Sequence, residues 1–294
     1  MTKKKPLPEH KYQSSDKIQS DDCKLNWIAS YPKSGNTWVR LFLAAYRNFG
    51  YLPSLNMLGD TSDYAYQWYQ LVSPKRLDEL TPHETMTIRP AACYQILHGW
   101  AATGRIKPLV KTHVCNSSLF GYPTIPHNLT HRAVYVVRDP RDLVVSYARH
   151  MKMPVDQAIA RMGAEGNALI EQKIVQPMNT WSFHVQSWKS KEYTHLIRYE
   201  DLLADPEKHF KAILNSIGLP FDQEIFDRAI AATTFERLKA AEAREGFKEN
   251  KTPGKQFFNK GSAGYWKTAL SPSQAKRIVK SHGPVMKELG YALD

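Results

Sequence analysis

The stretch LNWIASYPKSGNTWVRLFLAAYRNFG, residues 25–50, decides the fold of this chain. Its first part predicts a short buried strand that ends at Pro32, and the part from Asn36 to Phe49 predicts a helix with Gly50 just beyond it. Gly35 lets the backbone turn tightly between the two, and the unpaired N–H groups of the first helical turn form a site for a phosphate. The stretch therefore predicts a phosphate-binding unit of strand, loop and helix, similar to a P-loop.

Three further apolar stretches predict strands: PLVKTH (108–113), AVYVV (133–137) and HLIRYE (195–200). The second is followed by the helical pattern RDPRDLVVSYARH, and the third by a helix that Asp205 and Pro206 start. Short apolar strands that alternate with helices predict an α/β fold. We expect a single domain with a mainly parallel central sheet flanked by helices, whose ligands bind at the carboxyl ends of the strands.

The two ends of the chain differ in character. Residues 1–22 are polar and lysine-containing, so we expect a mobile N-terminal tail and a folded domain over residues 23–294. The segment AREGFKENKTPGKQFFNKGSAGYWK (243–267) has no sustained period and predicts a long loop. SPSQ (271–274) has the spacing of an N-cap, a first-turn proline and a capping-box partner, which predicts a C-terminal helix.

The charge balance points to an anionic partner. The chain carries 40 Lys and Arg against 28 Asp and Glu, a formal net charge of +12 that nucleic acid, an acidic membrane surface or a polyphosphorylated small molecule would each complement. Cys23, Cys93 and Cys115 are an odd number spread far apart, which argues against a disulfide framework and fits a reducing compartment. No stretch approaches ~18 consecutive apolar residues, so we expect a cytoplasmic protein without a membrane span.

The loop YPKSGNTW (31–38) contains side chains that could bind a ligand. A lysine and two hydroxyls join the ring of backbone donors, and Trp38 is placed to pack against a purine. The loop is shorter than GxxxxGK[ST] and has its lysine before the glycine, so it matches an ATP-binding P-loop poorly.

These residues resemble the 5′-phosphosulfate loop of sulfotransferases that use 3′-phosphoadenosine 5′-phosphosulfate (PAPS), usually written YPKSGTTW, with Asn36 in place of one threonine. The resemblance assigns Lys33 to the bridging oxygen and the charge of the leaving group, and Trp38 to the adenine. It assigns the 5′-phosphate to the backbone amides of the loop residues Ser34, Gly35, Asn36 and Thr37 and to the hydroxyls of Ser34 and Thr37.

Two later blocks resemble the elements of the same family that bind the 3′-phosphate. YVVRDPRDLVVSYARH (135–150) carries Arg138 and Ser146 at the matching positions, although pairing of Arg138 with Asp142 is an open alternative. FFNKGSAGYWK (257–267) is similar to the family's RKGxxGDWK, with Asn259 at the arginine position and Tyr265 at the aspartate position. The resemblance further implies that these residues lie near the nucleotide: Tyr199, Thr234, Phe235, Asn259, Lys260 and Gly261.

The stretch LVKTHVC (109–115) suggests the catalytic groups. Lys111 and His113 alternate along a strand and therefore point to one face, and histidine is the natural base near neutral pH. The family pattern K-x-H-L-P, here with Val114 and Cys115, implies that His113 takes the acceptor's proton while Lys33 and Lys111 neutralise oxygen charge. No metal is expected, because His113 and Cys115 are an isolated pair.

The resemblance implies transfer of a sulfuryl group from PAPS to a small-molecule alcohol or phenol, less readily to an amine. The alternatives are an ATP-dependent small-molecule kinase, which lacks its Walker lysine here, and a basic nucleic-acid-binding protein, for which no binding module is recognised. The family's dimer motif corresponds to KTALSPSQAK (267–276), with three defining residues replaced, so the oligomeric state stays open. Aromatic residues that could bound the acceptor are Tyr64, Tyr66, Trp68, Tyr69, Phe120 and Tyr122.

Overall fold

Five strands form a central sheet in the order β2-β3-β1-β6-β9, and each neighbouring pair is parallel. The computed structural model describes residues 24–58, 61–101, 108–171, 173–250, 256–258 and 261–294. The tail expected over residues 1–22 lies outside them. The strands are β1 (Leu25–Ser30), β2 (Thr61–Ser62), β3 (Leu109–Thr112), β6 (Thr130–Val137) and β9 (Thr194–Arg198).

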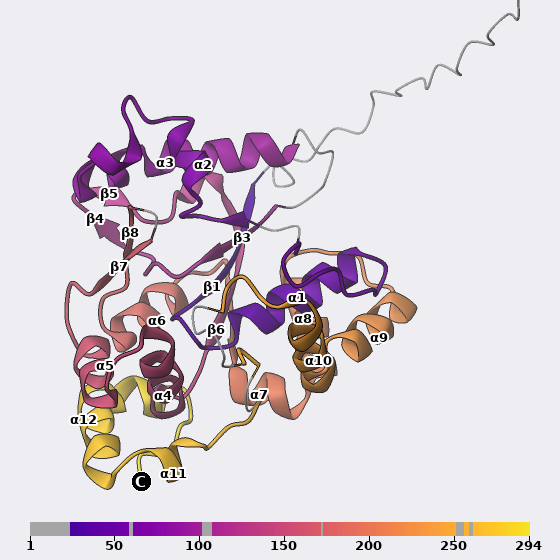
Figure 1. Ribbon diagram of the computed structural model, residues 1–294, viewed down its shortest axis with the longest axis vertical. Coiled ribbons are helices and arrows are strands. Elements are labelled where there is room, and N and C mark those ends of the chain that lie inside the picture. Colours follow the sequence, from indigo (N-terminus) through magenta and orange to yellow (C-terminus); the bar gives the residue numbers. More distant parts are fainter. Residues whose placement is uncertain (1–23, 59–60, 102–107, 172, 251–255, 259–260) are drawn as a thin grey trace, which may run out of the picture.

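Helices flank both faces of this sheet. Figure 1 shows α4 (Pro140–Met151), α5 (Val155–Met162), α6 (Trp181–Lys189) and α12 (Pro272–Glu288) on one side. On the other side lie α1 (Asn36–Arg47), α8 (Pro206–Ser216), α9 (Gln223–Ala232) and α10 (Phe235–Glu245). The predicted α/β fold with a parallel sheet between helices is confirmed.

The remaining elements are short or lie beyond the sheet. The helices are α2 (Tyr66–Gln70), α3 (Pro82–Ala101), α7 (Tyr199–Ala204) and α11 (Trp266–Ala269), with 3₁₀ turns at Leu77–Glu79 and His127–Leu129. Two antiparallel hairpins pair β4 (Ser118–Leu119) with β5 (Tyr122–Pro123), and β7 (Ala168–Glu171) with β8 (Ile174–Pro177).

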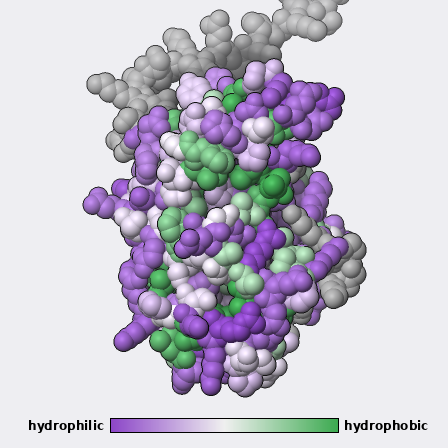
Figure 2. Space-filling model, turned by 90° about the vertical axis from the view of Figure 1, so that its left-hand side faces the viewer, coloured by the Kyte–Doolittle hydropathy of each residue, from purple (hydrophilic) through white to green (hydrophobic). Residues whose placement is uncertain are grey.

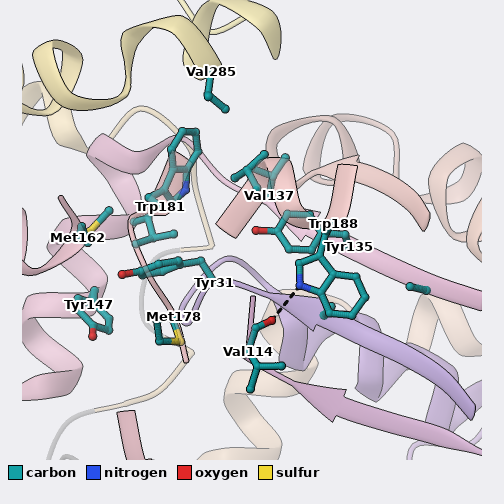
Figure 3. Close-up of a cluster of buried hydrophobic side chains, with 14 of the residues drawn as sticks. Tyr31, Val114, Tyr135, Val137, Tyr147, Met162, Met178, Trp181, Trp188 and Val285 are labelled. Atoms are coloured by element: carbon teal, nitrogen blue, oxygen red, sulfur yellow. Dashed lines mark hydrogen bonds between the residues drawn. The ribbon is translucent and has the colours of Figure 1, made fainter. Parts of the chain in front are cut away.

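Alternation along the strands divides the apolar core between the two faces. Trp27 and Tyr135 belong to the core under α4, α6 and α12, whereas their neighbours Ile28 and Val134 belong to the core under α1, α8 and α9. Figure 3 shows the first of these cores, where the indole of Trp188 donates a 2.9 Å hydrogen bond to the backbone carbonyl of Val114. The sheet is thus buried on both faces, as parallel sheets are.

Two boundaries differ from the sequence prediction. The strand predicted over residues 195–200 ends at Arg198, because its partner β6 ends at Val137, and Tyr199 begins the unpredicted helix α7. Helix α10 continues into the predicted loop as far as Glu245, and α11 forms near the end of that loop. The C-terminal helix is confirmed, with a capping box between Ser271 and Gln274.

The surface is largely polar on the face drawn in Figure 2, where hydrophobic side chains form small separate groups. Within the described ranges, no helix combines the length and the apolar character that a membrane crossing requires.

A buried ion pair fixes the carboxyl end of β3. Arg89 of α3 and Asp63 are both fully buried and paired with each other. The backbone N–H of Asp63 donates to the carbonyl of Lys111 at 3.1 Å, and the hydroxyl of Thr112 donates to the Asp63 carboxylate. The pair therefore holds the strand end on which Lys111 and His113 depend.

We predict that Asp63→Asn lowers the free energy of unfolding by about 3–5 kcal/mol, because it leaves the Arg89 guanidinium buried without a counter-charge. Urea denaturation measures this change. Asp78→Asn is the matched control, since Asp78 pairs with Arg76 at the surface, and its midpoint should equal that of the unchanged protein. Equal midpoints for all three proteins would contradict the anchoring role of the pair.

Candidate functional site

A cavity of about 800 Å³ lies at the carboxyl ends of the strands. Its wall collects residues from the β1–α1 loop, the end of β3, α4, β7, α7, α8, α10 and the segment around residues 248–262. Among the residues singled out in the sequence, the wall contains Lys33, Gly35, Asn36, Thr37, Trp38, Lys111, His113, Arg138, Ser146, Tyr199, Thr234, Phe235 and Gly261. Ser34 does not line it, and Asn259 and Lys260 lie outside the described residues.

The loop before α1 has the strained backbone that a tight strand-to-helix turn requires. Lys33 has φ 73° and Gly35 has φ 108°, both in the left-handed region. A Cβ atom on Gly35 would lie 2.6 Å from Cδ2 of Tyr199, so only glycine fits there. The side chain of Asn36 donates to the carbonyl of Ile28 at 2.8 Å, which ties the start of α1 to β1. Asn36 thus uses its side chain for a hydrogen bond within the protein, and its backbone N–H at the start of α1 can serve a ligand.

Arg138 joins three segments that are distant in sequence. Its guanidinium donates to the carbonyl of Lys33 at 3.4 Å and to that of Ser262 at 3.1 Å, and it lies 4.5 Å from the ring centroid of Tyr199. Its Nε is buried and has no hydrogen-bond partner in the described structure. One donor of a planar fork is therefore left for a ligand.

The alternative pairing of Arg138 with Asp142 is wrong. The Asp142 carboxylate instead accepts hydrogen bonds from the backbone N–H groups of Gly264 at 2.6 Å and Trp266 at 2.7 Å. Asp142 is buried at the start of α4, so these bonds anchor the end of the 246–265 segment against that helix. This contact holds Gly261 and Ser262 beside Arg138.

Aromatic side chains form one wall of the cavity. The Trp38 indole donates to the carbonyl of Thr233 at 2.9 Å, and its ring meets those of Tyr199 and Phe210 edge to face. Gly261 has φ 55°, and a Cβ atom there would overlap the ring of Phe235. The backbone of the 261–262 segment therefore lies directly against this wall, and only glycine allows the approach.

Lys33 is a cation in a poorly solvated position. Its Nζ lies 3.8 Å from the ring centroid of Phe257. Burial lowers the pKa of Lys33 to about 7, and the guanidinium of Arg149 adds to the lowering, more than Lys111 or Arg138 does. An anion bound beside Lys33 would restore its charge.

Lys111 has the opposite environment because of Glu249, which the sequence analysis did not single out. Nζ of Lys111 lies 3.0 Å from one Glu249 oxygen, and Nη1 of Arg40 lies 2.8 Å from the other. Burial alone would lower the pKa of Lys111, but Tyr64 and Glu249 outweigh it and raise that pKa. Burial acts to raise the pKa of Glu249, yet Arg40 and Lys111 hold it at about 2. Lys111 is therefore a fixed cation.

The hydrogen bond at Nδ1 of His113 decides where this imidazole can take a proton. Nδ1 lies 2.8 Å from the backbone carbonyl of Ser30, which can only accept, so Nδ1 carries the hydrogen and Nε2 keeps its lone pair. Burial and the charge of Lys111 hold the pKa of His113 well below 6.5. His113 is thus neutral at physiological pH and able to accept a proton at Nε2.

A second histidine, absent from the sequence prediction, supports the first. The fully buried His184 on α6 places Nε2 3.0 Å from the carbonyl of His113 and Nδ1 2.8 Å from the hydroxyl of Tyr135. Since the carbonyl must accept, Nε2 of His184 donates and the Tyr135 hydroxyl donates to Nδ1. The backbone of His113 is therefore held from the side opposite the cavity.

Among the described residues, no three His, Cys, Asp or Glu side chains are arranged to hold a metal ion. The chemical groups of the cavity include cations, hydroxyls, backbone N–H groups, aromatic rings and the neutral His113, while two of its carboxylates are already engaged, Glu249 with Lys111 and Arg40, and Asp142 with backbone N–H groups. Such a set suits a ligand with several anionic groups and a flat ring.

Residues 25–290 match the family model described as "Sulfotransferase domain". The chain therefore belongs to the sulfotransferase family, as its motifs indicated, and is an enzyme of that class.

Its similarity to individual sulfotransferases is distant but extends along most of the chain. It is 24% identical to Sulfotransferase 1A1 of Rattus norvegicus over 283 residues, which cover 90% of this chain and 85% of the relative. It is 25% identical to Cytosolic sulfotransferase 16 of Arabidopsis thaliana over 267 residues, 85% of this chain and 72% of the relative. A solved structure of retinol dehydratase in a complex with retinol and PAP shares the fold, with a TM-score of 0.61 at 20% identity over 91% of this chain and 82% of that one.

We predict that the protein loses stability as the pH falls below 6.5. Burial lowers the pKa values of His184 and His282 to about 4 and that of His113 well below 6.5. The unfolded chain binds protons on these histidines that the folded chain does not, so their contribution is complete above 6.5 and is lost toward pH 4. Each should cost roughly 1.4 kcal/mol per pH unit within that window.

Urea denaturation between pH 7.5 and pH 5 measures this dependence. His282→Gln provides the comparison, because His282 lies away from the cavity wall and its removal should reduce the slope by one histidine's share. Identical slopes for the two proteins would show that the buried histidines do not act in this way.

Proposed function

We propose that this enzyme transfers a sulfuryl group from PAPS to a hydroxyl of a small-molecule acceptor, leaving 3′-phosphoadenosine 5′-phosphate (PAP). The observation that carries the proposal is the convergence of the 31–38 loop, Arg138 and Gly261 on one cavity that also contains a neutral histidine. These segments are far apart in sequence: Lys33 and Arg138, for example, are separated by 105 residues. A shared ligand explains why they meet.

The cavity has the donors that two phosphate ends require. The loop N–H groups at the start of α1, with Thr37 and the Lys33 ammonium, suit the 5′-phosphate, and the Ser34 hydroxyl is buried beside them without a partner in the described structure. Arg138 offers its unpaired Nε to the 3′-phosphate, and Ser146 adds a hydroxyl from α4.

The adenine would lie against the aromatic wall. Trp38 provides its indole face, while Tyr199 and Phe235 border the same space and Thr234 caps α10 beside them. Gly261 allows the backbone to close over this wall, because any side chain there would displace Phe235. Asn259 and Lys260 would act from the same segment, but they lie outside the described residues.

Bound PAPS supplies an activated sulfuryl group that passes to the acceptor oxygen as its bond to the 5′-phosphate breaks. Nε2 of His113 takes the acceptor's proton, because the Ser30 carbonyl holds the other ring nitrogen as a donor. Lys33 gains full charge beside the anion and stabilises the leaving phosphate, while Lys111 keeps its charge through Glu249 and stabilises the transferring oxygens.

The acceptor side of the cavity is partly apolar. Tyr64, Met151, Leu169 and Ile170 line it, and of the aromatic residues suggested from the sequence only Tyr64 does so. An alcohol or phenol on a small apolar body fits this lining better than a charged amine. Cys93 and Cys115 are free and buried, which supports our placement of the protein in a reducing compartment, the cytoplasm.

We predict that Lys33→Ala and Arg138→Ala each weaken the binding of PAP by roughly 10- to 100-fold, since each removes a hydrogen bond to a charged group. Isothermal titration calorimetry with PAP measures the change. Lys208→Ala is the control, because Lys208 is an exposed lysine of α8 outside the cavity wall, and it should bind PAP like the unchanged protein. Equal affinity for PAP in all four proteins would contradict the proposal that the nucleotide binds in this cavity.

We predict that His113→Ala keeps its affinity for PAP within about twofold but loses roughly 10²- to 10⁴-fold in turnover, the usual contribution of a general base. The assay uses PAPS and a panel of small alcohols and phenols, with the best acceptor of the unchanged enzyme carried forward. His113→Gln tests the same loss with a polar side chain. Unchanged turnover in both variants would reject His113 as the base.

A further inference from the structure

Arg149 is a cavity-lining cation to which the roles above give no function. It lies near the C-terminal end of α4, one turn beyond Ser146, on the face of α4 that also presents Val145 and Asp142 to the cavity. Its side chain is half-buried, and its guanidinium makes no hydrogen bond or ion pair with any part of the chain that the structure describes. The sequence analysis did not single it out.

Two other cations of the wall have partners in the described structure. Lys111 is paired with Glu249, and Arg138 is held by two backbone carbonyls. Within the described part of the chain, the ammonium of Lys33 contacts the ring of Phe257 and no carboxylate. Among the described residues, Lys33, Arg149 and the exposed Lys248 therefore line this wall without a carboxylate partner.

Lys33 and Arg149 line the same cavity, Lys33 from the loop before α1 and Arg149 from α4, and they interact electrostatically. The guanidinium of Arg149 lowers the pKa of Lys33 more than any other charge does, although Lys111 and Arg138 line the same cavity. Two cations at the edge of a partly desolvated space repel each other, and an anion placed between them removes that cost. The arrangement therefore indicates an anionic group that faces Lys33 from the α4 side.

The proposed function gives the sulfuryl oxygens of PAPS one fixed cation, Lys111, and the inference, which rests on that proposal, gives them a second. The 31–38 loop suits the 5′-phosphate, and Arg138 with the backbone at Gly261 suits the 3′-phosphate. Lys33 marks the junction of the 5′-phosphate and the sulfuryl group. Arg149 lies one helical turn beyond Ser146 on α4, and Leu169 and Ile170 line the same cavity.

We propose that Arg149 binds the sulfuryl oxygens of PAPS and thereby makes the cavity prefer PAPS to PAP. The guanidinium offers a planar pair of N–H donors that matches two oxygens of a tetrahedral oxyanion. A fixed cation at this position holds the group that is transferred, whereas Lys33 acts on the group that leaves. Neither role replaces the other.

The main test compares PAPS and PAP as ligands in the absence of an acceptor. Isothermal titration calorimetry gives the dissociation constant of each nucleotide for the unchanged protein, Arg149→Met and Arg149→Lys. Arg149→Met should weaken PAPS roughly 10- to 100-fold while PAP stays within about twofold, because PAP lacks the group that Arg149 binds. Arg149→Lys should recover part of the loss, since it keeps the charge without the fork.

Lys152→Met is the matched control. Lys152 is exposed at the C-terminal end of the same helix, does not line the cavity, and carries the same charge. Its affinities for both nucleotides should equal those of the unchanged protein. Circular dichroism checks that each variant is folded, and Arg149→Lys carries the test if Arg149→Met is not.

Three outcomes would overturn the inference. Equal losses for PAPS and PAP would place Arg149 on a phosphate, and unchanged values for both would remove it from the nucleotide. Unchanged nucleotide affinities with a raised KM for the acceptor would assign Arg149 to an anionic group of the acceptor. If the unchanged protein bound neither nucleotide, the proposed function itself would fail.

Discussion

The parallel pairing of β1 with strands on both of its sides is the constraint on which the site depends. β1 pairs in register with β3, Ala29 opposite Thr112, and with β6, Ser30 opposite Val136. The three strands run in one direction, so the residues that follow them emerge at one edge of the sheet. Those residues include Lys33, His113 and Arg138. Burial of β1 on both faces fixes this register, because a slip by one residue would exchange the side chains that fill the two different cores.

The cavity concentrates positive charge and then treats each cation differently. Burial lowers the pKa of Lys33 to about 7, so its ammonium is partly deprotonated at neutral pH. The carboxylate of Glu249 keeps Lys111 charged. Arg138 is bound to backbone carbonyls on two segments and keeps one buried donor unused. Lys111 and Arg138 are thus held in place by protein groups, whereas the charge of Lys33 changes when an anion binds. The cavity also gives a local use to part of the chain's net charge of +12.

The sequence was sufficient for the fold class, and most of the site residues predicted from it line one cavity, because motifs and local patterns carry these signals. Gly35 between a strand and a helix, Arg138 directly after a strand, and the alternating Lys111 and His113 can each be recognised from their neighbours in sequence. Glu249, His184 and Arg149 escaped prediction for the opposite reason. Glu249 and His184 act through partners far away in sequence, Glu249 with Lys111 across 138 residues and His184 with His113 across 71, and Arg149 is distinguished only by its place on the folded cavity wall. Helix α7 was missed because its start depends on where β6 ends.

The most direct test of the account is hydrogen–deuterium exchange of the whole chain with and without PAP, followed by mass spectrometry. The account predicts slower exchange on PAP binding in three separate segments at once: residues 31–38, 138–146 and 261–266. The exposed backbone of the 163–166 turn after α5 should exchange at the same rate in both samples. Slower exchange in only one of the three segments, or in none of them, would contradict the claim that they share one nucleotide.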